Sequence, residues 1–166
     1  MFSAKPSRRL ANATLVLCLA AAGVGTNAHA QTGSVGADGL VRVRSAYPLD
    51  ETVQRIRADI AAKGIMFFQT VDQSALAAKA GITLRPSTLL EFGNPPLGAQ
   101  FLTANPNAGL DWPVRLLVSQ DESGAVWATW TDFAWIARRH GITNRQEQFA
   151  TATGVVESIT SAVTKR

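Results

Sequence analysis

The sequence predicts a single domain of the α/β (α+β) class, a two-layer sandwich in which a mixed β-sheet of about five strands packs against helices. Three observations lead to this prediction. Segments with the two-residue alternation or continuous apolar character of strands are interspersed with segments of helical periodicity. Their order is β-α-β-α-β-α-β-β-α-α, without a repeat or a linker that would divide the domain. A sheet covered by helices is the packing that this order favours.

The first strand and the first helix are predicted from two different periodicities of apolar residues. Residues 41–44 alternate apolar and basic side chains, which indicates a half-buried strand. The Tyr-Pro-Leu-Asp segment at 47–50 then begins a helix, with Asp50 or its neighbour as the N-terminal cap. Apolar residues recur at helical spacing over 53–61, and Lys63-Gly64 ends the helix with a cation and a residue that tolerates left-handed backbone.

The second strand and helix follow directly. Residues 65–71 form a continuous apolar run with two phenylalanines, which predicts a strand buried on both faces. Asp72 stops this run and can cap a short helix over 73–80, which ends at Gly81.

The third strand is predicted over 83–92, and proline-containing segments mark both of its ends. Arg85-Pro86 leads into it, and the rigid turn Gly93-Asn94-Pro95-Pro96 follows it. A short helix is expected over 97–104.

The C-terminal part is predicted as a hairpin followed by two helices. Residues 114–119 and 125–131 are strands joined by a polar turn, which favours an antiparallel pair. Asp132 can cap the next helix, and the last helix is expected over 144–163.

Residues 1–30 have the three parts of a secretory signal peptide. Basic residues precede an apolar run over 10–24, no acid occurs in the segment, and Ala28-His29-Ala30 is a small-x-small cleavage site. The alternative, a membrane anchor, requires a longer apolar core of about 20 residues. We therefore expect cleavage after Ala30, a periplasmic or secreted protein, and no stable membrane insertion afterwards; Sec and twin-arginine export both stay open. Residues 31–39 are then a flexible leader, and 40–166 are the domain.

Removal of this peptide changes the charge and the redox chemistry. The chain has 16 basic and 12 acidic residues, and the three basic residues of the peptide leave 13 against 12. A nearly neutral domain gives no reason to expect nucleic acid as a partner. The single cysteine, Cys18, also leaves, so the domain is expected to have no disulfide, thiol nucleophile or thiolate metal site.

The strongest candidate for ligand binding is the strand framed by Arg85-Pro86 and Gly93-Asn94-Pro95-Pro96. Such a frame can present Asn94, free backbone N–H groups and a cation to a small anion. The structural alternative is a tight turn in which Asn94 only caps a helix. The candidate ligand-binding residues are Asp72, Gln73, Arg85, Thr88, Gly93 and Asn94.

Enzymatic and metal chemistry have less support. Asp72 or Glu91 beside Arg85 could serve as the carboxylate base of a small-molecule hydrolase or isomerase. After cleavage one histidine remains, His140, in a basic helix end where a cation suits the helix dipole. No phosphate-binding loop, nucleophile elbow or zinc-ligand pattern occurs, so no cofactor and no metal are expected.

Four tryptophans fall within 24 residues. Trp127 and Trp130 have opposite parity on a strand, so one can face the core and the other a partner. A core cluster is the alternative.

Several segments, taken in order, resemble the family known as domain of unknown function 302. They are Tyr47 to Thr52, Lys63-Gly64 before the strand ending in Val71-Asp72, Ala77 to Gly81, Leu84 to Leu90, Phe92-Gly93-Asn94-Pro95, Trp112 to Arg115, and Gly124 to Trp127. The resemblance spans about residues 40–150. It implies a compact α/β domain that self-associates and has no settled activity. Many relatives carry a histidine after the aspartate matched by Asp72, where this chain has Gln73.

Together these observations predict a non-enzymatic periplasmic homodimer. It would bind a small anionic ligand or an envelope protein through a surface around Asp72, Arg85 and Asn94. This hypothesis requires that these residues and Thr88 meet on one concave surface. The alternatives are the hydrolase or isomerase above, or an envelope protein that acts only through assembly.

Overall fold

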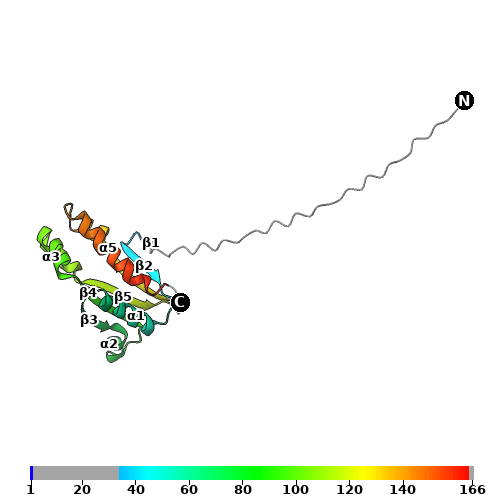
Figure 1. Cartoon of the computed structure of the whole chain (residues 1–166). Coiled ribbons are helices and arrows are strands. Elements are labelled where there is room, and N and C mark those ends of the chain that lie inside the picture. The colour runs from blue at the N-terminus through cyan, green and yellow to red at the C-terminus, as the bar shows by residue number, and fades with distance from the viewer. Residues whose placement is uncertain (2–33, 165–166) are drawn as a thin grey trace.

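A six-stranded β-sheet forms one layer of the molecule and helices form the other (Figure 1). The computed structural model describes residue 1 and residues 34–164, so the expected signal peptide and its cleavage site lie outside the described residues, apart from Met1. The two-layer α/β class is confirmed. In chain order the elements are β1 (Ser34–Val35), β2 (Leu40–Arg44), α1 (Leu49–Ala62), β3 (Met66–Asp72), α2 (Gln73–Lys79), β4 (Ser87–Gly93), α3 (Pro95–Ala104), the 3₁₀ helix η1 (Pro106–Asp111), β5 (Val114–Gln120), β6 (Val126–Thr131), α4 (Phe133–Arg139) and α5 (Gln146–Ser161).

The sheet has the order β1-β2-β6-β5-β4-β3, and each pairing among the described strands is antiparallel. The expectation of a mixed sheet was wrong in this respect. Helices α2 and α3 connect strands that are neighbours and antiparallel, so the chain turns back at the sheet end instead of crossing over to a parallel strand. The hairpin of β5 and β6 is confirmed.

β2 enters the sheet beside the last strand, β6, and the two-residue β1 pairs with β2. β1 lies within the segment expected to be a flexible leader. Gly39 has φ of 73°, a backbone conformation that glycine adopts without the usual steric cost, at the turn between these two strands.

Three of the predicted helix caps are confirmed and one is wrong. Asp72, Asn94 and Asp132 each accept a hydrogen bond from a backbone N–H in the first turn of α2, α3 and α4. Asp50 instead lies inside the first turn of α1, whose N-cap residue is Pro48. Pro48 fixes an extended backbone there, which starts the helix one residue before the carboxylate.

β3 is an edge strand, and the prediction that both of its faces are buried was wrong. Met66 and Phe68 are 51% and 42% exposed, and the register with β4 shifts between Phe67 and Gln69. An apolar run identifies a strand but does not tell whether helices cover one face of the sheet or both.

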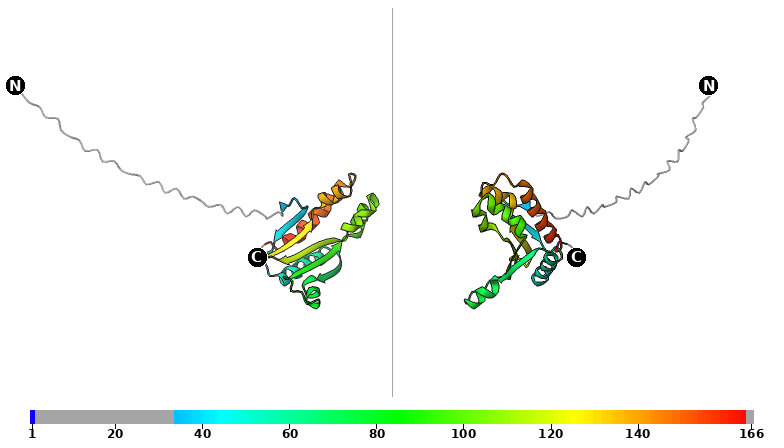
Figure 2. Two further views of the ribbon diagram at one scale, coloured as in Figure 1. Left: turned by 180° about the vertical axis from the view of Figure 1, so that it is seen from behind. Right: turned by 60° about the vertical axis from the view of Figure 1, so that its left-hand side comes forward.

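The core lies between the sheet and the helices. Buried positions alternate along β2, β4 and β6, and α1 and α5 lie on the same side of the sheet (Figure 2). Trp130 faces this core at 3% exposure, whereas Trp127, of opposite parity, is half-buried on the other face. Among the described residues, no helix combines the length and the apolar character needed to cross a membrane.

Candidate functional site

The six residues predicted to bind a ligand lie at the two ends of β4 and do not form one site. Asp72 is the register partner of Thr88 near the start of β4, and Gly93 is the partner of Met66 at its end. Six positions separate Thr88 from Asn94, which corresponds to about 20 Å along a strand. The common concave surface that the sequence hypothesis required is therefore not formed.

At the first end, Asp72 and Gln73 hold the start of α2 against β4. Asp72 Oδ1 accepts hydrogen bonds from Ala75 N and Ser74 Oγ, each at 2.8 Å. The Ala75 N–H, followed by the Ser74 hydroxyl, lowers the pKa of Asp72, so this carboxylate is a weak base. Gln73 Oε1 accepts from Ser87 Oγ at 2.8 Å. These contacts are those of a helix cap.

Arg85 and Glu91 have separate partners and do not contact each other. Arg85 is exposed and contacts only the exposed Glu122, at 3.5 Å, among the described acids. Glu91 accepts a hydrogen bond from Gln69 Nε2 at 2.9 Å on the neighbouring strand. A carboxylate base beside Arg85 gains no support from these contacts.

At the second end, Asn94 caps α3. Its Oδ1 accepts from Leu97 N at 3.3 Å, which confirms the structural reading that the sequence left open. Gly93 lies against the indole of Trp112, and both Gly93 and Asn94 border an apolar cavity beneath that indole.

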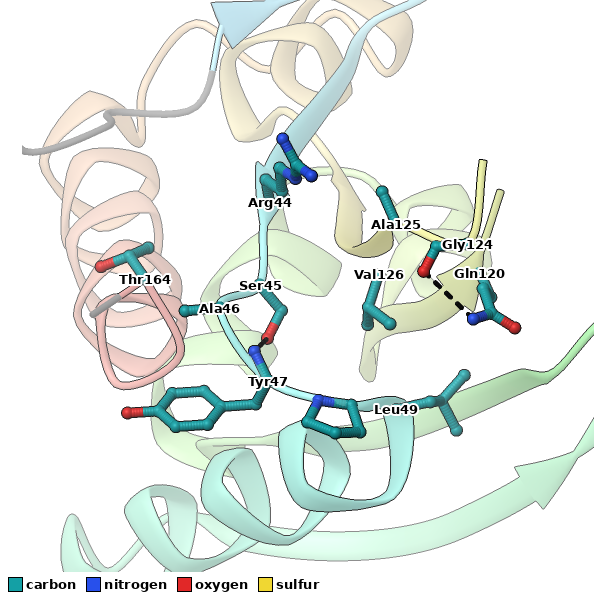
Figure 3. Close-up of a pocket in the computed structure, with 11 residues that line it drawn as sticks. Arg44, Ser45, Ala46, Tyr47, Leu49, Gln120, Gly124, Ala125, Val126 and Thr164 are labelled. Atoms are coloured by element: carbon teal, nitrogen blue, oxygen red, sulfur yellow. Dashed lines mark hydrogen bonds between the residues drawn. The ribbon is translucent and has the colours of Figure 1, made fainter. Parts of the chain in front are cut away.

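A more spacious cleft, of about 580 Å³, opens where β2 ends and α1 begins (Figure 3). The β5–β6 turn and the residue beyond the end of α5 complete it. It is lined by Arg44, Ser45, Ala46, Tyr47, Pro48, Leu49, Gln120, Gly124, Ala125, Val126 and Thr164.

The cleft has a fixed polar floor. Ser45 Oγ and Thr52 Oγ1 are both buried and lie 2.6 Å apart, and Ser45 Oγ accepts a hydrogen bond from Tyr47 N at 3.1 Å. Thr52 Oγ1 also lies within bonding distance of Pro48 O, at 2.9 Å. This network ties the strand end to the first turn of α1, so the β2–α1 connection is rigid at the cleft.

Arg44 supplies a cation at the cleft that no described acid neutralises. Arg42, two residues earlier on the same face of β2, forms an ion pair with Asp38 at 2.7 Å, whereas Arg44 has no carboxylate within 4.0 Å among the residues that the structure describes. Gln120 Nε2 donates to Gly124 O at 3.1 Å and keeps the β5–β6 turn closed beside the cleft.

The start of α1 adds a smaller positive potential. Within the described chain, no side chain caps this 14-residue helix, so the N–H groups of its first turn point toward the Pro48–Leu49 side of the cleft without a capping oxygen. Asp50 and Glu51 in that turn offset part of the potential, and Glu51 is paired with Arg55 at 2.8 Å. The arrangement can hold a small anion, chiefly through Arg44.

Asp121 fixes the hairpin turn on the far side of the cleft. Its Oδ1 accepts from Ser123 N, Ser123 Oγ and Ala125 N, and its Oδ2 accepts from Trp127 Nε1 at 2.8 Å. The hydroxyl of Ser123, then the indole of Trp127, lower the pKa of Asp121 to about 2.

Contacts to one buried carboxylate join η1 to the end of α4. The Asp111 side chain, 5% exposed, lies 2.6 Å from His140 Nε2 and 3.1 Å from Arg139 Nη1, and Arg115 approaches it at 3.4 Å. His140 is the C-cap of α4, as the sequence predicted, but its acidic partner is 29 residues away and gave no local signal. Among the described residues, no three His, Cys, Asp or Glu side chains are placed to hold a metal ion.

Comparison with known families matches residues 41–164 to the Domain of unknown function DUF302. The crystal structure of an uncharacterized conserved protein DUF302 from Bacillus stearothermophilus superposes with a TM-score of 0.69 at 17% identity, covering 75% of this chain and 98% of that one. This likeness concerns the fold.

Curated relatives carry a different name. Proteins named Fluoride-specific ion channel FluC 1, from Brucella suis and Brucella abortus, are 41% identical over 104 residues, which is 63% of this chain. The match spans only 41% and 38% of their lengths, so this chain corresponds to about two fifths of each relative.

Proposed function

The chain belongs to the DUF302 family, whose domain has no assigned function, and from this premise we propose that it is a non-enzymatic domain that binds a small anion in the cleft at Arg44. The observation that carries the proposal is a guanidinium on a 580 Å³ cleft without a carboxylate partner among the described residues. Arginine presents several N–H donors in a planar fork that matches carboxylate, phosphate or sulfate oxygens. The proposed ligand class, a small anion, is the one that the sequence predicted, but the proposed site lies at the end of β2 and not around β4.

The remaining features of the cleft support binding rather than turnover. The Ser45 hydroxyl is buried and engaged with Thr52, and the nearby carboxylate of Asp121 has a lowered pKa and four hydrogen-bond donors. A serine nucleophile is commonly activated by an adjacent base, and the described partners of Ser45 Oγ include no carboxylate or imidazole. The lowered pKa of Asp121 makes its carboxylate a weak base and a weak nucleophile. The channel activity in the relatives' name is not part of the proposal, because the match leaves most of their length uncovered.

Titration with inorganic phosphate and with acetate, at constant ionic strength, tests the anion site. Arg44→Gln should weaken binding at least about tenfold, which corresponds to about 1.4 kcal/mol. Arg42→Gln is the matched control, because Arg42 lies on the same face of the same strand and is already paired with Asp38. Equal losses of affinity in both variants would show that binding depends only on the net positive charge of this face, which contradicts a specific site at Arg44. The absence of saturable binding by the wild type would refute the proposal.

We further propose that the domain acts outside the cytoplasm. The basic start, apolar run and small-x-small site of residues 1–30 support this address. Mass spectrometry of the protein from cells should find Gln31 as the first residue. Retention of Met1 or Cys18 would contradict export with cleavage.

We also propose that the protein is a homodimer. The described residues include eight large apolar side chains that are exposed, and five of them are concentrated at one edge of the molecule. These five are Met66, Phe68, Leu76, Ile82 and Leu84. An apolar patch of this kind is typical of a protein interface. An isologous contact uses the same patch on both copies and needs no second surface.

A further inference from the structure

An apolar cavity of about 90 Å³ lies between α3, α5 and the sheet, at the far end of the sheet from the Arg44 cleft. Its inner wall consists of buried side chains, among them Phe92, Phe101, Phe133 and Val156. The exposed residues Asn94 and Thr151 mark the place where it meets solvent.

Water is a poor occupant of this cavity. Its volume is several times the 10–15 Å³ that one water molecule requires, but a buried water also needs two to four polar partners. Away from the exposed Asn94 and Thr151 at the mouth, the lining side chains offer one polar atom, Trp112 Nε1, which is fewer than the partners that a buried water needs. Apolar cavities of about 150 Å³ stay dry and bind benzene-sized molecules. A volume of 90 Å³ with an open mouth therefore suits one ring or a short branched alkyl group, with the rest of the ligand at the mouth.

Trp112 forms one wall of the cavity in a fixed position. Its indole lies directly on Gly98, where an added Cβ would overlap Nε1 and Cε2, and it packs edge-on against Phe68 with ring centroids 5.7 Å apart. A glycine inside α3 costs about 0.5–1 kcal/mol relative to alanine. Glycine at position 98 thus weakens the helix but leaves the space that the Trp112 indole occupies.

The Trp112 indole N–H is a donor without a protein acceptor. No described residue accepts a hydrogen bond from Nε1, although Trp127 Nε1 in the same chain is bonded to Asp121. Among the described residues the fully buried unpaired side-chain atom is Arg145 Nε, so the Trp112 N–H retains access to solvent or to a ligand. A tryptophan N–H on an apolar wall usually finds a partner, and here a ligand can provide it.

We propose that this cavity binds a small, largely apolar molecule that carries one hydrogen-bond acceptor, with the acceptor on Trp112 Nε1. The apolar part fills the space between Phe92, Phe101 and Val156. The site is separate from the anion cleft, and its ligand needs no charge.

The test follows the indole N–H signal of Trp112 by NMR in the purified ¹⁵N-labelled protein, with acetophenone as the probe. α-Methylstyrene has the same shape but lacks the carbonyl acceptor. Acetophenone should shift the Trp112 signal saturably and bind at least about tenfold more tightly than α-methylstyrene. Equal affinities would overturn the role of the indole donor, and no saturable shift would overturn the site.

Two variants separate binding in the cavity from binding elsewhere. Ala152→Leu fills the cavity and should weaken acetophenone binding at least about tenfold, whereas Ala150→Leu, exposed on the same helix, should leave it unchanged. Trp112→Phe keeps an aromatic wall but lacks the indole signal, so binding to it is followed by the backbone amide signals of Gly93 and Gly98, which border the cavity. It should show no preference for acetophenone over α-methylstyrene. If Ala152→Leu does not fold, the Trp112→Phe comparison still decides the question, and a preference that survives in it contradicts the proposal.

Discussion

At the scale of single residues, Asp121 shows how one carboxylate can organise a turn. It accepts hydrogen bonds from Ser123, Ala125 and Trp127, and these donors hold its pKa near 2, against an ordinary value of 3.8. A carboxylate with a lowered pKa in the folded state stabilises that state above its unfolded pKa. Its contribution is lost as the pH falls from about 4 toward 2.

We therefore predict that Asp121→Asn lowers the urea midpoint of unfolding at pH 7, and that the difference from wild type narrows between pH 4 and pH 2. The asparagine oxygen can replace Oδ1, but its NH₂ group then faces the Trp127 indole N–H, so two donors oppose each other. Glu157→Gln, on the exposed face of α5, is the control and should show no comparable pH-dependent loss. A difference that stays constant down to pH 2 would contradict the charge argument.

Single residues also differ in how far the sequence alone predicts their roles. Asp72, Asn94 and Asp132 were predictable as caps, because a cap bonds within three residues of itself. Arg44 was not predicted as a candidate, because the cleft that it lines is built by the β2–α1 connection, the β5–β6 turn and the residue after α5, which are far apart in the sequence. Asp111 was missed because its partners come from later in the chain.

At the scale of elements, α3 carries a glycine whose cost is explained by its neighbour. Gly98 to alanine should ordinarily stabilise a helix by about 0.5–1 kcal/mol. Here the new Cβ would overlap Trp112, with Cδ1 only 2.7 Å away, and the indole cannot swing aside because Phe68 and Gly93 flank it. Overpacking of this kind costs about 1–3 kcal/mol.

We predict that Gly98→Ala destabilises the protein by about 1–2 kcal/mol and alters tryptophan fluorescence. Gly154→Ala, inside α5 with nothing within 4 Å of its added Cβ beyond its chain neighbours and the backbone of its own helix, should instead stabilise the protein by about 0.5–1 kcal/mol. Denaturant unfolding of both variants measures the two free energies. Stabilisation by both would show that the Trp112 contact does not constrain α3.

The elements themselves were largely predictable, and their environments were not. Periodicity and caps located the helices and the hairpin, because both signals are local. The apolar run that became β3 was taken as buried on both faces, yet its Met66 and Phe68 lie at the sheet edge. Whether one or both faces of a strand are buried depends on which faces of the sheet the helices cover, and no local pattern carries that information.

At the scale of the whole molecule, the antiparallel sheet leaves β3 as an open edge beside α2. Among the described helices α2 is unusual, since none of its seven residues is buried, and it lies at the end of the sheet outside the layer formed by α1 and α5 (Figure 2). The register shift within β3 disfavours pairing of two edges into one continuous sheet, as bulges do in other edge strands. The proposed dimer is therefore expected to form through side chains around α2 and β3.

This arrangement places the expected dimer contact at one edge of the molecule. Leu76, on α2, is 54% exposed, and Leu110, in η1, is 66% exposed outside that edge. Light scattering after size exclusion should give the mass of a dimer for the wild type and for Leu110→Glu, and a monomer mass for Leu76→Glu, because a buried glutamate without a partner costs the interface several kcal/mol. Glutamate is a good helix former, so loss of α2 does not explain the result. A monomeric wild type would refute the dimer, and equal dissociation by both variants would place the contact outside the α2 and β3 edge.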